Sequence, residues 1–76
     1  MRELVEVMAK ALVDNPDQVV VTEKETDEEV LIELTVAPSD MGKVIGRQGK
    51  IVKQIRILMR AVAQRKGKKI SVEILD

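Results

Sequence analysis

The apolar residues recur with helical spacing in some segments and at every second position in others. The order of these segments limits the possible folds more than any other feature. Residues 2–13 carry apolar side chains at helical spacing, and the Asp-Asn-Pro sequence that follows them is typical of a helix end. Residues 18–22 contain three consecutive valines and residues 30–36 alternate in polarity, so each segment predicts a strand. The connection between them, residues 23–29, is short and highly charged, which favours an antiparallel hairpin.

The second half of the chain changes from helical to alternating spacing in the same way. A short helix is predicted over residues 39–45, and Gly46 ends it. A long helix is predicted over residues 49–66, where an apolar stripe continues without a helix breaker. Gly67 suits the C-terminal cap of this helix, and residues 70–74 alternate in a last strand.

The order helix, strand, strand, helix, helix, strand predicts an α+β fold with a three-stranded mixed sheet. A right-handed crossover through the last two helices would place the final strand parallel to the second one, with the helices packed on one face of the sheet. A chain of 76 residues has room for one domain, residues 1–76, with one small core.

The composition excludes several kinds of chemistry. The chain has no cysteine and no histidine, so disulfides, zinc clusters, thiol nucleophiles and imidazole catalysis are absent. We therefore expect no enzyme activity, no metal and no cofactor. The apolar runs are far shorter than the roughly 20 residues that span a bilayer, and the N-terminus mixes acids into its apolar positions. We expect a soluble cytoplasmic protein without a membrane partner.

The net charge of zero hides a division of charge along the chain. Residues 1–40 hold three bases and 11 acids, a net of −8, whereas residues 41–76 hold ten bases and two acids, a net of +8. Such asymmetry between halves points to a polyanionic partner. The alternative is that the two halves face each other, or a second subunit.

Residues 44–52, VIGRQGKIV, contain two glycines three positions apart. A Walker phosphate loop needs Gly, four residues, Gly-Lys and then Ser or Thr. Counting back from Gly49 puts Val44 where the first glycine should stand, and Ile51 follows Lys50. A dinucleotide fingerprint also needs a glycine at position 44. Both nucleotide-binding motifs are therefore excluded.

What remains is a Gly-X-X-Gly turn between two predicted helices. Gly46 and Gly49 allow a phosphate chain to approach the backbone closely. The free amides and the dipole at the start of the following helix favour an anion, and Arg47 and Lys50 add positive charge. Taken alone, such a turn more often only joins two helices.

Residues 44–55, VIGRQGKIVKQI, resemble the signature of KH domains, whose Gly-X-X-Gly loop clamps the backbone of about four nucleotides. The apolar positions of that signature match Val44, Ile45, Val52 and Ile55. The element order is similar to the bacterial, type II, form of the domain. Over its whole length, including LVEVMAKALVDNP and VAPSDMGKVIGRQGK, the chain resembles the KhpA family of small bacterial proteins with a single KH domain.

The resemblance implies that single-stranded RNA or DNA lies in a groove between the Gly-X-X-Gly loop with its two helices and the second strand. Lys53 and Arg56 either extend the positive surface of this site or, as is more common for bases on a long helix, are only solvated. Four further parts of the chain either offer apolar contact to bases or belong to the core, and the core is the favoured alternative for each: Ile45, Met41, Val52 and residues 34–36. The RNA-binding residues carried over by the motif and its flanks are Gly46, Arg47, Gln48, Gly49, Lys50, Lys43, Ile45 and Lys53.

The chain has no Phe, Tyr or Trp, which sets it apart from other nucleic-acid modules. RRM, OB-fold and cold-shock domains stack bases on aromatic rings, so these folds are disfavoured. Without stacking, much of the affinity would come from phosphate contacts, and binding would depend strongly on salt.

The resemblance also implies a biological setting. It implies an RNA chaperone or post-transcriptional regulator that forms homodimers and joins a larger KH-domain partner, KhpB (also called Jag or EloR), with a link to cell shape, cell-wall biogenesis and envelope growth. The alternative is a protein–protein assembly module in which the acidic and basic halves pair with a protein and the glycine loop is vestigial.

Overall fold

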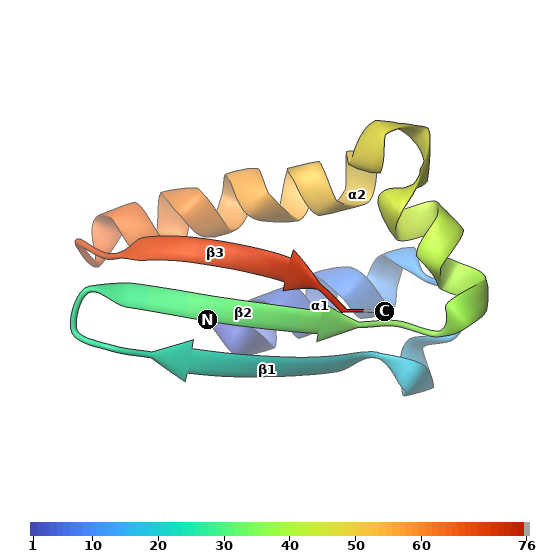
Figure 1. The fold of residues 1–76 in the computed structure, drawn as a ribbon, viewed down its shortest axis with the longest axis horizontal. Helices are drawn as coiled ribbons and strands as arrows, with labels where there is room; N and C mark the ends of the chain where they lie inside the picture. Colours follow the sequence, from blue (N-terminus) through green and yellow to red (C-terminus); the bar gives the residue numbers. More distant parts are fainter. Residues whose placement is uncertain (76) are drawn as a thin grey trace.

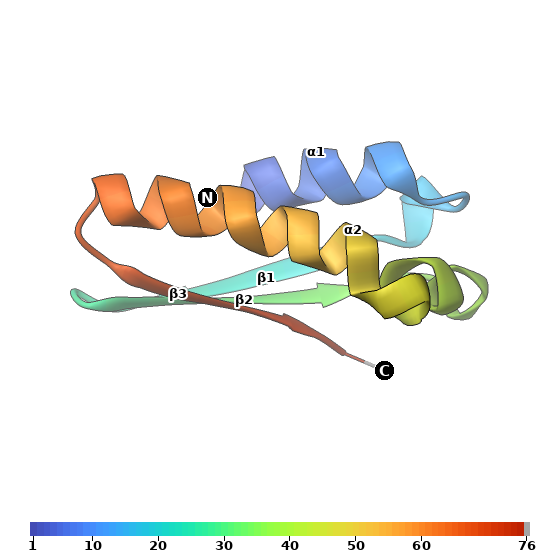
Figure 2. The same cartoon turned by 90° about the horizontal axis from the view of Figure 1, so that it is seen from above.

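The computed structural model has two layers, with a sheet on one side and the helices on the other (Figures 1 and 2). It describes the backbone of residues 1–75 and the side chains of residues 1–44 and 51–75. The predicted α+β fold with a mixed three-stranded sheet is confirmed. In chain order the elements are α1 (Arg2–Leu12), η1 (Pro16–Gln18), β1 (Val20–Glu25), β2 (Glu29–Thr35), α2 (Pro38–Arg65) and β3 (Lys69–Ile74).

The strands lie in the order β1-β2-β3, so β2 is central and β3 is an edge strand. As predicted, β1 and β2 form an antiparallel hairpin, and β2 and β3 are parallel. The alternation in β2 sets which face is buried, because successive side chains of a strand point to opposite faces. Val30, Ile32 and Leu34 are buried against the helices, whereas Leu31 and Glu33 lie on the open face of the sheet.

Helix α2 covers both helices that were predicted between β2 and β3. Its first part, residues 38–44, and its second part, residues 51–65, run in different directions (Figure 1). We call these parts the first arm and the second arm. The predicted Gly-X-X-Gly turn, from Gly46 to Gly49, falls between the arms, within the residues whose side chains are not described.

The core lies between the sheet and the helices and is built from aliphatic side chains and one methionine. Fully burying one such side chain stabilises a fold by about 1.5–3 kcal/mol relative to leaving it exposed. Helix α1 contributes a narrow stripe, Val5 and Ala9, while the second arm of α2 contributes four buried residues. The buried members of the core cluster are Val5, Ala9, Val19, Val21, Val30, Ile32, Leu34, Val36, Val44, Val52, Ile55, Met59 and Val72.

Gly67 ends α2, as the sequence predicted. Its φ of +68° is in the left-handed region, which glycine adopts without a steric penalty. The Gly67 amide donates to the Gln64 carbonyl at 3.1 Å, and the Lys68 amide donates to the Ala63 carbonyl at 3.0 Å. These two bonds satisfy carbonyls at the helix end and turn the chain directly into β3.

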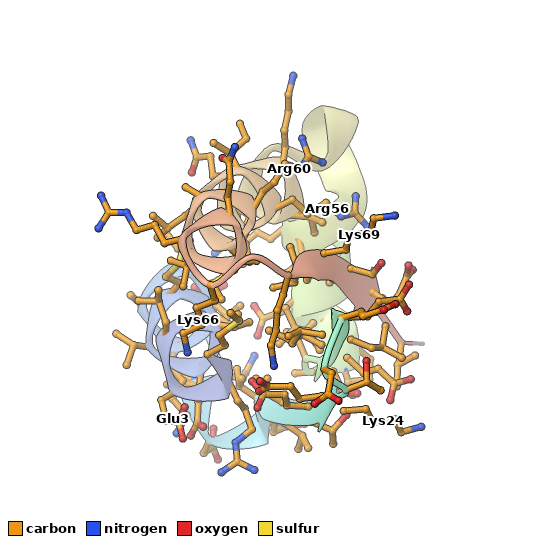
Figure 3. All side chains as sticks on the ribbon, turned by 90° about the vertical axis from the view of Figure 1, so that its left-hand side faces the viewer. Glu3, Lys24, Arg56, Arg60, Lys66 and Lys69 are labelled. Atoms are coloured by element: carbon orange, nitrogen blue, oxygen red, sulfur yellow. The ribbon has the colours of Figure 1, made fainter. Side chains whose placement is uncertain are left out.

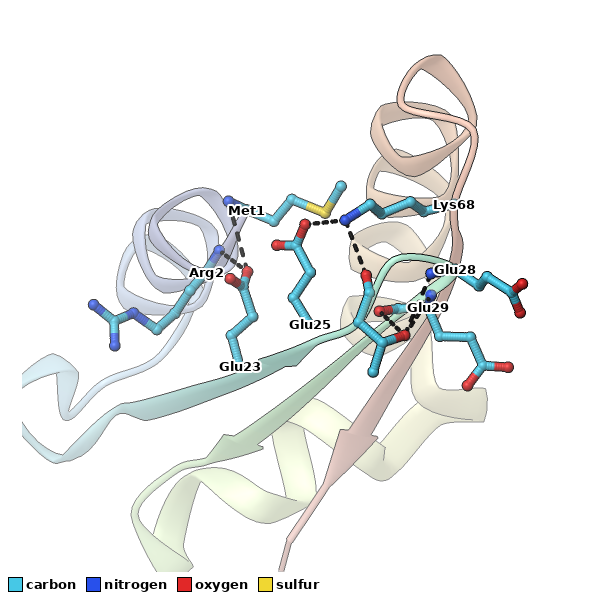
Figure 4. Close-up of polar contacts among 8 residues, drawn as sticks. Met1, Arg2, Glu23, Glu25, Glu28, Glu29 and Lys68 are labelled. Atoms are coloured by element: carbon cyan, nitrogen blue, oxygen red, sulfur yellow. Dashed lines mark hydrogen bonds and ion pairs between the residues drawn. The ribbon is translucent and has the colours of Figure 1, made fainter.

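The hairpin turn is tied to this helix end (Figure 4). The Thr26 hydroxyl accepts hydrogen bonds from the amides of Glu28 and Glu29, at 3.4 and 3.0 Å. The Lys68 ammonium donates to the Glu25 carboxylate and, at 3.0 Å, to the Thr26 carbonyl. The Lys68 partner lowers the pKa of Glu25. The charged connection, residues 23–29, is therefore held to the end of α2 by its contacts with Lys68.

Candidate nucleic-acid interface

A groove lies between the second arm of α2 and the open edge of β3, which run alongside one another in Figure 1. It has a volume of about 200 Å³ and is open to solvent. Because β3 pairs only with β2, one side of its backbone is free to face this groove. The lining residues are Arg56, Arg60, Ile70, Ser71, Val72 and Glu73.

The side chain of Arg56 bridges the groove. Its Nε and Nη2 atoms donate to the Val72 carbonyl oxygen at 3.1 and 2.9 Å. The amides of Lys69 and Leu75 donate to carbonyls of the hairpin and β2. Because alternate residues of a strand direct their N–H and C=O groups to opposite sides, Val72 directs its own to the open edge. Arg56 thus satisfies an acceptor that the sheet leaves unpaired, and its guanidinium is held within the groove.

Basic residues follow the groove along the second arm. Lys53, Arg56 and Arg60 are spaced by three and four residues, which places them on one face of a helix. Lys53 and Arg60 are exposed. Figure 3 shows Arg56 and Arg60 on the side of α2 that faces β3, and Arg60 and Lys69 line one hollow. We call Lys53, Arg56 and Arg60 the basic stripe; it leads away from the segment that carries the two glycines.

Beyond Arg60 the groove widens into a hollow of about 800 Å³ around the beginning of β3. Gln64 continues the face of the basic stripe there, and Lys24 and Lys69 add positive charge from the two edge strands. Glu29, which lies beside Lys69 in the register of the sheet, is also part of this lining. The positive charge is therefore less continuous here than along the basic stripe.

The predicted site residues divide into three groups. Ile45, Gly46, Arg47, Gln48, Gly49 and Lys50 have side chains outside the described part, so their contacts remain predictions. Lys53 is exposed on the second arm, three residues before Arg56, and its contact with RNA stays a prediction. Lys43, by contrast, contacts the loop after α1.

The Lys43 ammonium donates to the Asp14 carboxylate at 2.7 Å. This hydrogen bond raises the pKa of Lys43, so the side chain keeps its positive charge. Lys43 therefore has a protein partner, and a phosphate would have to compete with Asp14 for it.

The expected second wall of the groove, the second strand with its loop, stays a prediction, but the aliphatic residues named there do not face a groove. Leu34 and Val36 are buried in the core, because β2 is the central strand and is covered by the helices. Val52 is buried too, and Met41 is partly buried against the core, so the favoured alternative for these aliphatic residues is confirmed. The wall opposite α2 is β3. Arg60 also lines the groove and was not among the predicted residues, although its spacing from Lys53 and Arg56 is a signal that could have found it.

Charge pairing between the two halves of the chain is limited. Among the side chains that the structure describes, two ion pairs join a base of residues 41–76 to an acid of residues 1–40, namely Lys43 with Asp14 and Lys68 with Glu25. The basic stripe is not part of either pair. The division of charge is therefore only partly explained by the halves facing each other.

The residues that the structure describes contain no group of three or more side chains that could hold a metal ion. None of the helices formed there combines the length and the apolar character needed to cross a bilayer.

Comparison with known proteins identifies the family. The family model described as "KhpA/KhpB, KH domain" matches residues 2–74. The chain belongs to this family of KH domains. Similar proteins include two named "RNA-binding protein KhpA", from Caldanaerobacter subterraneus (55% identical) and Clostridium perfringens (52% identical), each aligned over 99% of this chain and all of the relative. A third of the same name, from Listeria monocytogenes, is 47% identical over the full length of both chains.

No solved structure matches the chain. The family assignment accounts for the Gly-X-X-Gly motif, because the KH domain is an RNA-binding module and not an enzyme. In this KH domain the two glycines join the arms of α2, and the second arm carries the basic stripe past the open edge of β3.

Proposed function

We propose that this KH domain binds single-stranded RNA, and single-stranded DNA of similar shape, in the groove between α2 and β3. The observation that carries the proposal is the basic stripe, which begins a few residues after the glycine motif and of which Arg56 and Arg60 line an open groove at a sheet edge. The names of the relatives, all RNA-binding proteins, support it.

The glycine segment and the groove have different tasks in this proposal. Gly46 and Gly49 let the RNA backbone approach closely, and Arg47, Gln48 and Lys50 face its phosphates without an acid among them. Ile45 supports the segment, and Lys43 and Lys53 flank it. The basic stripe then guides the following phosphates along β3. Since the chain has no aromatic residue for stacking, phosphate contacts supply most of the affinity.

We further propose that the protein acts in the cytoplasm as an RNA chaperone or post-transcriptional regulator. A single small site gains from a second one by effective concentration, which favours a homodimer or a complex with a larger KH-domain protein. The family description, which joins KhpA with KhpB, supports such a partner. A role in cell shape and cell-wall biogenesis would follow from the transcripts that the complex binds.

A titration of fluorescently labelled single-stranded RNA tests the RNA site. We expect the double variant Arg47→Asp, Gln48→Asp to remain folded by circular dichroism and to lose most of its RNA affinity, because two acids would repel phosphate. The matched control is Arg2→Asp, Val7→Asp, which makes the same change of net charge, −3, at exposed positions of α1. If the loop variant binds as tightly as the wild type, the glycine segment is not the RNA site.

The assembly-module alternative has an observation in its favour. The helices expose apolar side chains, with Val7 65% and Ile57 58% exposed. Isolated exposed apolar residues are common, so this observation weighs less than the groove. Light scattering over a range of concentrations tests it. An assembly module without RNA function would form a complex but show no RNA binding in the titration above.

A further inference from the structure

The carboxylate of Asp40 is the only buried charged group among the side chains that the structure describes. It lies in the first turn of α2 and is 0% exposed. It accepts hydrogen bonds from the amides of Asp14 and Asn15, both at 3.0 Å, and from the Asn15 side-chain amide at 3.1 Å. Three donors from the loop after α1 therefore meet on one side chain of the first arm.

Two more contacts join the same segments. The Asn15 side chain donates to the Ser39 hydroxyl at 3.1 Å, and Lys43 binds Asp14. We call the contacts among Asp14, Asn15, Ser39, Asp40 and Lys43 the polar anchor. It fastens the first arm of α2 to the loop after α1, and these segments also lie close together in Figure 1.

The first arm has little apolar anchorage of its own. Val44 is its one buried aliphatic residue with a large side chain, and Met41 is partly buried. The second arm is held by Val52, Ile55 and Met59, which are all buried. The orientation of the first arm relative to the groove therefore depends on the polar anchor more than on the hydrophobic core.

A buried carboxylate is a poor choice for stability alone. Removing a charge from water is costly, and a well-packed apolar residue of similar volume is often neutral or better. What directed hydrogen bonds add is a single defined geometry, because each bond constrains both distance and angle. Three bonds to one carboxylate indicate that the placement of the first arm matters.

We infer that Asp40 is a positioning residue for RNA binding. It would hold the first arm, and with it the start of the glycine segment, at a defined angle to the groove without touching the RNA. This inference rests on the proposed function, because it assumes that RNA contacts both the glycine segment and the basic stripe. Two contact regions held by different arms bind one strand well only when their relative position is correct.

The test compares Asp40→Asn with Thr26→Ala. The asparagine keeps the size of the side chain but replaces one acceptor oxygen by an amide that faces backbone donors. Thr26→Ala removes a hydroxyl that, like the Asp40 carboxylate, accepts hydrogen bonds from two backbone amides, but in the hairpin turn rather than at the anchor. Affinity for a short single-stranded RNA is measured per folded molecule, with the folded fraction taken from chemical denaturation.

We expect Asp40→Asn to weaken RNA binding about five- to tenfold, the size of a typical coupling between separate sites. The dependence of affinity on salt should keep the wild-type slope, because no phosphate contact is lost. Thr26→Ala should bind RNA as the wild type does. A folded Asp40→Asn variant that binds within about twofold of the wild type, or that binds no worse than Thr26→Ala, would overturn the inference.

A second pair of variants covers the case in which Asp40→Asn does not fold. Asn15→Ala removes the side-chain bonds to Asp40 and Ser39 but leaves the backbone amide bond in place. Asp14→Asn weakens the ion pair with Lys43 and frees the Lys43 charge for phosphate, so charge alone would strengthen RNA binding whereas loss of the anchor would weaken it. If the anchor positions the arm, both variants weaken RNA binding. Wild-type or stronger binding by both contradicts the inference.

These outcomes differ from a failure of the proposed function. If the wild type does not bind RNA, or if Arg47→Asp, Gln48→Asp binds normally, the RNA site itself is wrong. If that loop variant loses binding and the anchor variants do not, the RNA site stands and only the role of Asp40 is rejected.

Discussion

Arg56 and Arg60 differ in one contact, and this difference gives a quantitative test of the groove. Both belong to the basic stripe, one helical turn apart. Arg56 donates twice to the Val72 carbonyl, whereas the structure assigns Arg60 no hydrogen bond of this kind among the described residues. Replacing each by methionine removes the charge and retains an apolar stem of similar length. We expect the two variants to share their effect on RNA binding and to differ in stability.

The stability difference follows from the Val72 contact. A hydrogen bond to a charged group contributes about 1.5–3 kcal/mol, and a carbonyl at an open strand edge regains water when its partner is lost. Arg56→Met should therefore lower the free energy of unfolding by about 1–2 kcal/mol. In a domain of this size each kcal/mol of lost stability lowers the melting temperature by roughly 4–8 °C. Arg60→Met should stay within about 0.5 kcal/mol of the wild type, as surface substitutions usually do.

The effect on RNA comes from lost phosphate contacts. For single-stranded nucleic acid each contact contributes about 0.7 to the slope of log affinity against log salt. Each variant should therefore reduce that slope by about 0.7 if its arginine contacts one phosphate. Fluorescence anisotropy at several salt concentrations measures the slope, and urea unfolding measures the stability.

Two results would refute this account of the groove. If Arg60→Met leaves both affinity and slope unchanged, the RNA does not follow the basic stripe. If Arg56→Met loses stability but keeps the wild-type slope, Arg56 only protects the strand edge. Lys10→Met, on α1, is a control for the loss of one positive charge far from the groove.

Three further predictions concern the fold. Ile32→Ala, at a fully buried position of the central strand, should cost about 2–5 kcal/mol in urea unfolding, while Ile57→Ala, at an exposed position, should cost under about 0.5 kcal/mol; equal losses would contradict the assigned core. Gly67→Ala should lower stability by about 1–2 kcal/mol in thermal unfolding, because the left-handed backbone disfavours a Cβ. The cost is one of backbone conformation and not of space, since a Cβ added there would have no atom within 4 Å apart from those of the adjoining residues. The pKa of Asp40 is lowered below its ordinary value of 3.8, mainly by the Asp14 amide, so its ionised form stabilises the fold above that pH and this contribution is lost as the pH falls through the lowered pKa. Urea midpoints measured from neutral to acid pH should therefore fall less steeply in Asp40→Asn than in the wild type, and parallel curves would disprove the linkage.

The local pattern of the sequence was enough to predict most of the fold. The alternation of Val30, Ile32 and Leu34 marks the buried face of β2, because a strand repeats every two residues whatever surrounds it. Gly67 marks the end of α2 for a similarly local reason, since its left-handed backbone is favourable mainly for glycine. The Gly-X-X-Gly motif and its apolar flanks were also enough to indicate the KH family, which the family model confirms.

The position of the groove was not predictable in the same way. Periodicity shows which side of a strand is apolar, but it does not show which strand lies at the edge of the sheet. The second strand was expected to form a wall of the site, and the structure places it in the centre with β3 at the open edge. Only that edge leaves the Val72 carbonyl available to Arg56.

The sequence by itself determined the types of element, their order, the buried faces and the family motif, because all of these depend on residues close together in the chain. The tertiary structure alone decided that Arg56 meets Val72, 16 residues away, and that Asp40 meets Asp14, 26 residues away. Such contacts depend on how the layers pack, and no local period encodes them. They are also the contacts that shape the groove and hold the arm of the helix that leads into the glycine segment.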